Sequence, residues 1–180
     1  MLVSDWMRWL AIPLLVACGG AATSAPPKPA EDPPERSWPT GKPIGAKAPP
    51  FRAKNEAGGA PLTLVPGKVN VIVFWATWSS PDLRLLRDLE PVWKRYESRG
   101  LVISALSVDE GEKSVFQVAR EQHTTFPIGW DERHAIADRY QPETDPCLFV
   151  VDRSGVVRFY DRGYHDGDAT MIAGQIESLL

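Results

Sequence analysis

Apolar residues gather in short runs along the chain from residue 69 to the C-terminus. Runs of this length without strict alternation are typical of strands that are covered by helices on both faces. The strands are expected at Val69–Trp75, Leu101–Val108, Phe126–Ile128, Leu148–Val151 and Val156–Tyr160. The last two flank the sequence Asp152-Arg153-Ser154-Gly155, which is typical of a tight turn and indicates a hairpin.

Between these runs, apolar residues recur every three or four positions, which is the spacing of an amphipathic helix. The clearest case is the segment from Asp82 to Ser98, with apolar side chains at Leu83, Leu86, Leu89, Trp93 and Tyr96. Further helices are expected at Lys113–Gln122, Glu132–Tyr140 and Ala169–Leu180. Strands that alternate with helices and end in a hairpin predict an α/β fold, a three-layer sandwich with a mixed central β-sheet flanked by helices.

The first 43 residues follow neither pattern. Nine of the 17 prolines lie between Gly19 and Pro50, and the segment Gly19–Pro43 has almost no apolar periodicity. Such a composition cannot bury enough surface to fold, and its prolines favour an extended, semi-rigid spacer. A binding segment for a proline-recognising partner is the alternative interpretation.

The N-terminus has the features of a targeting segment. Residues 1–17 contain Arg8 and then the apolar run Trp9–Ala17, which is too short to cross a bilayer and has the length of a signal-peptide core. The run ends in Leu15-Val16-Ala17-Cys18, which resembles a bacterial lipobox, in which the cysteine is lipidated and begins the mature chain. A cleaved secretory signal with a chance Cys18 is the alternative.

These features predict three parts of the chain. Residues 1–17 are a lipoprotein signal peptide, residues 18–43 a lipidated Cys18 with its proline-rich tether, and residues 44–180 one folded domain. The protein is then expected in the bacterial cell envelope, held to a membrane by lipid and facing the periplasm. No aspartate follows Cys18, which favours the outer membrane. The net charge of −3 gives no indication of a nucleic-acid partner.

Several motifs in residues 44–180 resemble the thioredoxin superfamily, specifically its membrane-anchored TlpA/ResA branch of redoxins. The motifs occur in family order and are Gly45-Ala46-Lys47-Ala48-Pro49-Pro50-Phe51, Gly67-Lys68-Val69, Phe74-Trp75-Ala76-Thr77-Trp78, Ser107-Val108-Asp109-Glu110, Phe126-Pro127, Asp145-Pro146 and Phe149-Val150-Val151-Asp152-Arg153-Ser154-Gly155. The resemblance implies a thioredoxin-like fold. It also implies thiol-disulfide oxidoreductase activity, which the family performs with a Cys-x-x-Cys motif directly after the aromatic motif.

The chain departs from the family at that motif, because it has Ser79-Ser80-Pro81-Asp82 in its place. Thiol-disulfide exchange needs a thiolate nucleophile, and a serine hydroxyl neither ionises at physiological pH nor forms a disulfide. Asp82 cannot resolve a mixed disulfide either. Activity that depends on the two cysteines is therefore expected to be absent, no cofactor or metal site is expected, and whether the chain is an enzyme stays open.

Three interpretations of Ser79–Asp82 remain. In the first, the segment only begins a helix, with Ser80 as N-cap, Pro81 in the first helical position and Asp82 in the first turn. In the second, helix amides and the hydroxyls of Ser79 and Ser80 form a surface that contacts an anion or a peptide. In the third, Ser79 is a hydrolytic nucleophile, which needs a histidine base, but His123, His134 and His165 lie in no recognisable motif.

The remaining candidate residues lie beside this segment in the family's fold. Pro146 matches the family's cis-proline, which faces the active-site motif and helps to hold extended peptides. Cys147 follows it and is either a buried small hydrophobic residue or an accessible thiol that forms mixed disulfides. Trp75 is expected in the core, whereas Trp78 either packs beside the loop or forms a stacking wall for a ligand.

Three functions follow from these alternatives. The first is an envelope lipoprotein that binds an extended peptide or protein partner through Trp78, Ser79, Ser80, Asp145 and Pro146 without dithiol chemistry. The second is redox activity through the single thiol of Cys147. The third is a structural or assembly lipoprotein whose domain has no binding groove in use. Fold alone does not decide among them, because the residues that carry the family's chemistry are the ones that differ.

Overall fold

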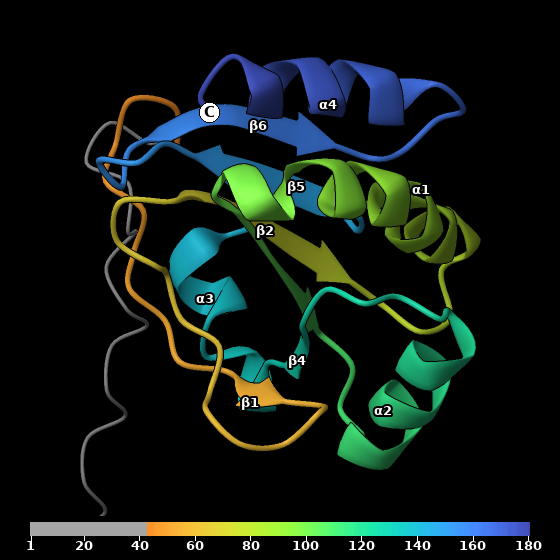
Figure 1. Ribbon diagram of the computed structural model, residues 1–180. Helices are drawn as coiled ribbons and strands as arrows, with labels where there is room; N and C mark the ends of the chain where they lie inside the picture. Colours follow the sequence, from red (N-terminus) through yellow and green to blue (C-terminus); the bar gives the residue numbers. More distant parts are fainter. Residues whose placement is uncertain (1–42) are drawn as a thin grey trace, which may run out of the picture. The chain divides into compact units, whose positions relative to one another are not determined.

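The computed structural model of the chain describes residues 43–180 (Figure 1). The expected signal peptide, the lipidated Cys18 and nearly all of the tether lie outside the described residues and stay predictions. Within residues 43–180, none of the helices is both long and apolar enough to cross a membrane.

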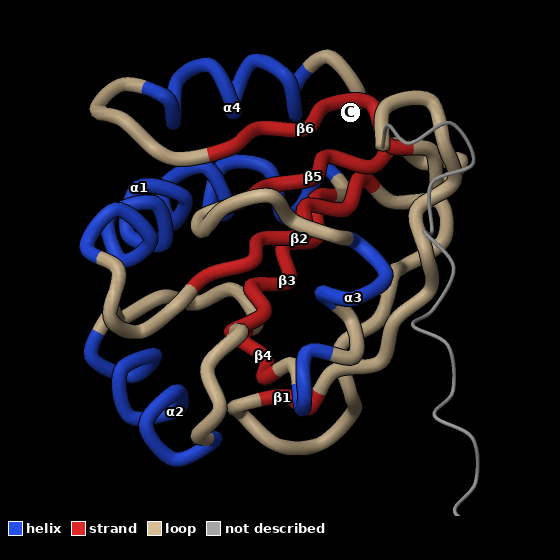
Figure 2. Tube along the Cα trace, turned by 180° about the vertical axis from the view of Figure 1, so that it is seen from behind, coloured by secondary structure: helices blue, strands red, loops and turns tan. Residues whose placement is uncertain are grey.

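A single mixed sheet of six strands, in the order β1-β4-β3-β2-β5-β6, forms the middle of the described structure (Figures 1 and 2). Three strands, β2, β3 and β4, are parallel to one another, whereas β5 is antiparallel to β2, β6 to β5 and β1 to β4. The strands are β1 (Lys54–Asn55), β2 (Val69–Trp75), β3 (Leu101–Ser107), β4 (Ile128–Trp130), β5 (Cys147–Val151) and β6 (Val157–Arg162). All seven residues of β2 are buried, as expected for a central strand covered on both faces.

Helices cover both faces of the sheet. They are α1 (Ser80–Tyr96), α2 (Glu112–Glu121), α3 (Ala137–Tyr140) and α4 (Asp168–Glu177), with short 3-10 turns at Glu97–Arg99 and Glu132–His134. The core on one face joins Val71, Val73 and Trp75 of β2 to side chains of α1, α2 and α4. The core on the other face joins Ile72 and Phe74 to α3 and the segment that precedes β1. The predicted three-layer α/β sandwich is thus confirmed.

Two local predictions are wrong. The strand expected at Phe126–Ile128 begins at Ile128 instead, because Pro127 has no N–H and contributes only its carbonyl, which accepts a hydrogen bond from Ala105. The helix expected over Glu132–Tyr140 is interrupted, since Arg133 and His134 have positive φ angles of 57° and 59°. It restarts where the Asp131 carboxylate accepts the N–H groups of residues 136 and 137, at 2.8 and 2.7 Å.

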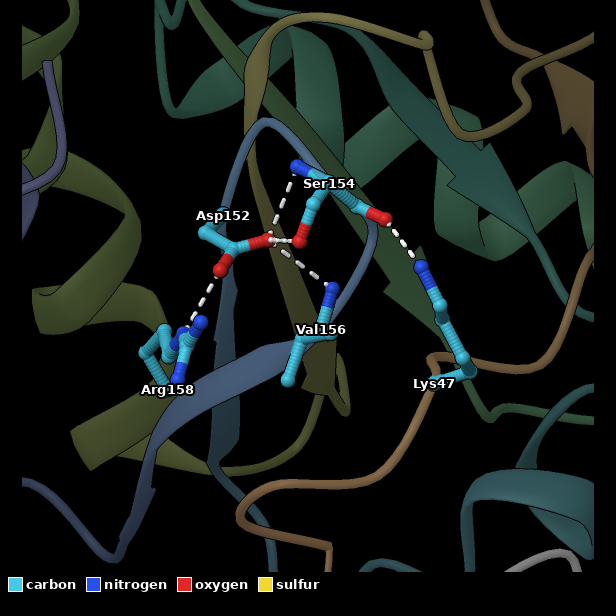
Figure 3. Close-up of polar contacts among 5 residues, drawn as sticks. All are labelled: Lys47, Asp152, Ser154, Val156 and Arg158. Carbon is cyan, nitrogen blue, oxygen red and sulfur yellow. Dashed lines mark hydrogen bonds and ion pairs between the residues drawn. The ribbon is translucent and has the colours of Figure 1, made fainter.

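The predicted hairpin is present, and one aspartate organises its turn (Figure 3). Oδ1 of Asp152 accepts hydrogen bonds from the backbone and hydroxyl of Ser154, at 2.9 and 2.6 Å, and from the backbone of Val156 at 3.0 Å. Its Oδ2 accepts one from Nε of Arg158 at 2.6 Å. Lys47 donates to the Ser154 carbonyl, and this contact fastens the segment that enters the domain to the turn.

Candidate functional site

The candidate site begins at the loop of residues 76–79, which joins the carboxyl end of β2 to α1. Ser79, rather than the expected Ser80, occupies the N-cap position, and its side chain caps no helix amide. Pro81 lies in the first turn, where its missing N–H leaves no helix hydrogen bond unmade. The helix start predicted from sequence is therefore present but shifted by one residue.

Asp82 ties this loop to the first turn of α1. Its side chain is 0% exposed, and its carboxylate accepts one hydrogen bond from the hydroxyl of Ser79 and one from the backbone N–H of Ala76, the latter at 2.7 Å. Burial raises the pKa of Asp82 to about 6, and the nearby charge of Asp145 also raises it. The hydrogen bonds from Ser79 and Ala76 lower the pKa, but by less than burial raises it. The carboxyl at the family's second cysteine position is thus an internal brace of the loop.

A second aspartate, which sequence reasoning did not single out, holds the loop from β3. Asp109 accepts hydrogen bonds from the N–H and the hydroxyl of Thr77, at 2.8 and 2.9 Å, and from the hydroxyl of Ser107 at 2.7 Å. Its carbonyl accepts one from the indole of Trp130 at 2.7 Å. The motif that contains Asp109 was visible in the sequence, but its contact with a loop 32 residues away was not.

The two tryptophans of the aromatic motif differ completely in exposure. Trp75 is fully buried, as expected, and its indole nitrogen has no hydrogen-bond partner among the described residues. Trp78 is 76% exposed, so it does not pack beside the loop. A large aromatic side chain on a loop that is fixed on both sides is available to a binding partner.

The segment before β5 completes the site. The peptide bond between Asp145 and Pro146 is cis, and Pro146 is buried. Burial raises the pKa of the half-buried Asp145 carboxyl, and the charge of Asp109 raises it further, whereas His134 lowers it. The charge of Asp145 in turn raises the pKa of Asp82, so the two carboxyls lie close together. The structure thus brings Ser79–Asp82 and Asp145–Pro146, the two segments predicted from sequence, to one place.

Cys147, the first residue of β5, is only 1% exposed. It pairs with Phe74 of β2 on one side and Arg162 of β6 on the other. Burial raises the pKa of its thiol to about 12, although a hydrogen bond with Tyr160 lowers it. These surroundings match the alternative of a buried small hydrophobic residue rather than an accessible thiol.

The described residues offer little for hydrolysis or metal binding. The Ser79 hydroxyl is paired with Asp82, not with a histidine. His134 lines a hollow of about 370 Å³ next to Asp145, and His165 lies near Asp168 with 3.5 Å between Nδ1 and Oδ2. Within residues 43–180, no group of three or more His, Cys, Asp and Glu side chains is arranged to hold a metal ion.

Comparison with known proteins identifies the family. A model of the AhpC/TSA family matches residues 44–160, which is well over half of the chain. The chain belongs to the AhpC/TSA family. The match agrees with the resemblance to thioredoxin-fold redoxins seen in the sequence motifs.

Among curated relatives, the thiol-disulfide oxidoreductase ResA of Bacillus cereus is 29% identical over 115 residues. This match covers 63% of the chain and 66% of the relative. The thioredoxin-like protein YneN of Bacillus subtilis is 31% identical over 117 residues, which is 63% of the chain and 68% of the relative. The chain thus spans about two thirds of the length of these family members.

Solved structures show the same fold. A putative thiol:disulfide interchange protein DsbE from Chlorobium tepidum superposes with a TM-score of 0.71 at 22% identity, over 76% of this chain and 96% of that one. A putative protein disulfide isomerase from Bacteroides thetaiotaomicron gives a TM-score of 0.69 at 24% identity, over 76% and 89% of the two chains. The domain is therefore a thioredoxin-fold member of a family that includes thiol-disulfide oxidoreductases.

The raised pKa of Asp82 predicts a pH-dependent stability. Its folded pKa of about 6 lies above the usual 3.8, so the folded state favours the protonated carboxyl, and this contribution is lost as pH rises from about 4 to about 6. As pH rises from 4 to 8, the unfolding free energy of Asp82→Asn is expected to increase by about 1–3 kcal/mol relative to that of the natural chain. Urea denaturation at several pH values measures this difference. Asp166→Asn, which removes an exposed carboxylate, is the control, and an equal gain in both variants would contradict the assignment.

The burial of Cys147 predicts an unreactive thiol. With a pKa of about 12, its thiolate fraction at pH 8 is roughly a thousandfold below that of an ordinary cysteine. We expect Ellman's reagent to modify Cys147 at least about a thousandfold more slowly in the folded chain than in urea. Any reaction with the reagent that remains in the Cys147→Ser variant comes from Cys18. Rapid modification of the folded chain that is lost in this variant would contradict the expected burial.

Proposed function

We propose that this protein is a thioredoxin-fold envelope lipoprotein that has lost the dithiol active site and binds an extended peptide or protein partner. The binding surface consists of Trp78, Ser79, Ser80, Asp145 and Pro146. The single observation that carries the proposal is the exposed Trp78 on a loop fixed by two aspartates, at the position where the family's chemistry takes place.

The side chains at the site support the proposed loss of redox chemistry. Residues 79–82 contain no sulfur, and the Ser79 hydroxyl donates to a neighbouring carboxyl. The remaining cysteine of the described residues, Cys147, is buried, and its thiol has a pKa of about 12. Exchange at this site has no thiolate to start it, so single-thiol activity is the weaker alternative.

The electrostatics of the site favour a peptide over an anion. Three carboxyls, those of Asp82, Asp109 and Asp145, lie around the start of α1, and their mutual repulsion already raises the pKa values of Asp82 and Asp145 beyond the effect of burial. Another negative charge would be repelled there. The exposed ring of Trp78 offers instead the kind of rigid aromatic anchor that dominates many protein interfaces.

The location is part of the same proposal. A lipid on Cys18 and the tether of residues 18–43 would hold the domain at a bacterial membrane, with the outer membrane favoured by the residues after Cys18. The oxidoreductase activity in the names of the curated relatives belongs to those proteins and is not proposed for this chain. The alternative is a structural or assembly lipoprotein that binds no peptide at this surface, and the binding experiment distinguishes it from the proposal.

Binding at this surface is tested with a phage-displayed library of random extended peptides selected on the full chain. We expect selected peptides to lose at least about tenfold in affinity for the Trp78→Ala variant, because removing an aromatic anchor costs more than about 1 kcal/mol. Met171→Ala removes another exposed hydrophobic side chain, on α4, and is expected to bind unchanged. A library that yields no peptide dependent on Trp78 would favour the structural alternative.

Reductase activity tests the chemical half of the proposal. In an insulin-reduction assay, the natural chain and Cys147→Ser are both expected to give the uncatalysed rate, because neither has a thiolate at the start of α1. The double variant Ser79→Cys/Asp82→Cys restores both sulfurs to the positions that the fold provides, and it is expected to accelerate the reaction. Catalysis by the natural chain that disappears in Cys147→Ser would overturn the proposal in favour of a single-thiol centre.

A further inference from the structure

A part-buried hydrogen bond joins the C-terminal helix to the edge strand of the sheet. Asp161 lies in β6 and Gln175 in α4, which runs along that strand (Figure 1). Nε2 of Gln175 donates a hydrogen bond to Oδ1 of Asp161 at 3.4 Å. The other oxygen of each group, Oδ2 of Asp161 and Oε1 of Gln175, is buried and has no partner among the described residues.

The two unpartnered atoms belong to one pair, and both are acceptors when Asp161 is ionised. Leaving two buried acceptors unsatisfied is unfavourable, and a folded protein rarely tolerates it. A single proton on Oδ2 removes both deficits, because the acid O–H can then donate to the amide oxygen. A carboxylic acid and a carboxamide joined in this way form a closed ring with two hydrogen bonds.

We propose that Asp161 is protonated in the folded protein and forms a cyclic acid–amide pair with Gln175, which acts as a pH-dependent latch between α4 and β6. Loss of the proton leaves Oδ2 of Asp161 and Oε1 of Gln175 as two acceptors without a donor, one of them on a charged group. The helix is then held by its apolar contacts, including the buried Ile172 and Ile176, and by the exposed ion pair between Glu177 and Arg99. The latch is thus closed at low pH and weakened as pH rises.

The charges around Asp161 agree with a neutral carboxyl. Burial raises its pKa, the hydrogen bond from Gln175 lowers it, and the charge of Asp168 at the start of α4 raises it again. The two arginines of β6 serve other carboxylates, since Arg158 pairs with Asp152 and Arg162 with Glu143.

Three further titratable groups, Tyr164, His165 and Asp166, belong to the connection between β6 and α4. Asp166 is exposed, and its carboxylate lies 3.9 Å from Nη1 of Arg84 in α1. Tyr164 donates its hydroxyl to Asp88 of α1 at 2.6 Å, and His165 lies beside Asp168. Opposite Asp161 on β5 is the apolar Leu148. Within the described residues no cation is therefore paired with Asp161, and a bound proton is the simplest source of the missing donor.

The sign of the effect follows from proton linkage. Opening of α4 exposes Asp161 to water and returns its pKa toward 3.8, so opening releases a proton wherever the pH lies between that value and the higher folded pKa. In this window the opening equilibrium rises by up to about tenfold per pH unit, and above it the equilibrium is constant.

Hydrogen exchange of the α4 amides on the full chain between pH 4 and pH 8, corrected for intrinsic rates, measures this equilibrium. Asp161→Asn is the matched variant, because an asparagine can donate to Oε1 and accept from Nε2 at every pH. We expect protection of α4 to fall with pH in the natural chain and to stay level in Asp161→Asn. Asp166→Asn removes an exposed carboxylate of the same connection and is expected to keep the pH dependence.

Carbon-13 NMR of the Asp161 carboxyl gives a second readout that does not depend on helix opening. The proposal expects titration clearly above 3.8, with the shift of a protonated acid below the midpoint. Titration at or below 3.8 would show an ionised carboxylate with an unseen donor, such as a water molecule, and would overturn the latch. Equal pH dependence of α4 protection in the natural chain and Asp161→Asn would overturn it as well.

Discussion

The buried carboxyl of Asp82 is the interaction on which the arrangement of the site depends. It receives hydrogen bonds from both ends of the four-residue loop, through Ala76 and Ser79, and it belongs to the helix that the loop begins. Asp109 holds the middle of the same loop at Thr77. The loop is thus held at Ala76, Thr77 and Ser79, and it presents Trp78 to solvent.

This bracing lies at the positions where the resemblance places the family's two cysteines. A dithiol site needs a helix start that stabilises a thiolate. Here the same helix start carries a hydroxyl and a carboxyl that form a hydrogen bond with each other. The scaffold has a central strand buried on both faces and helices on either side, and at the start of α1 both Ser79 and Asp82 take part in internal hydrogen bonding.

The sequence was sufficient for the elements whose apolar pattern is long. The strand Val69–Trp75 was predicted to the residue, because every one of its side chains is buried. The pattern did not reveal the two-residue strand β1, which is too short to show a period. It also did not reveal the break at Arg133 and His134, because apolar periodicity carries no information about the hydrogen bonds that the Asp131 side chain makes with residues 136 and 137.

The same distinction applies to the site. Its residues were found through contiguous motifs, but their environment arises from contacts across the sheet. The brace by Asp109 spans 32 positions along the chain, and the burial of Cys147 depends on neighbours in β2 and β6. No local pattern contains that information, since burial and hydrogen bonding between separated segments appear only once the strands are aligned.

The attachment of the entering segment has a consequence for how the domain is presented. Gly45 donates to the carbonyl of Val157 and Ala46 accepts from its N–H, at the end of β6 that lies beside Val151. The loop with Trp78 is at the other end of the sheet, where β2 finishes next to Cys147. A pulling force on the chain ahead of residue 43 would therefore act first on hydrogen bonds that lie a full strand length from Trp78. Such a force would leave the shape of the surface around Trp78 unchanged.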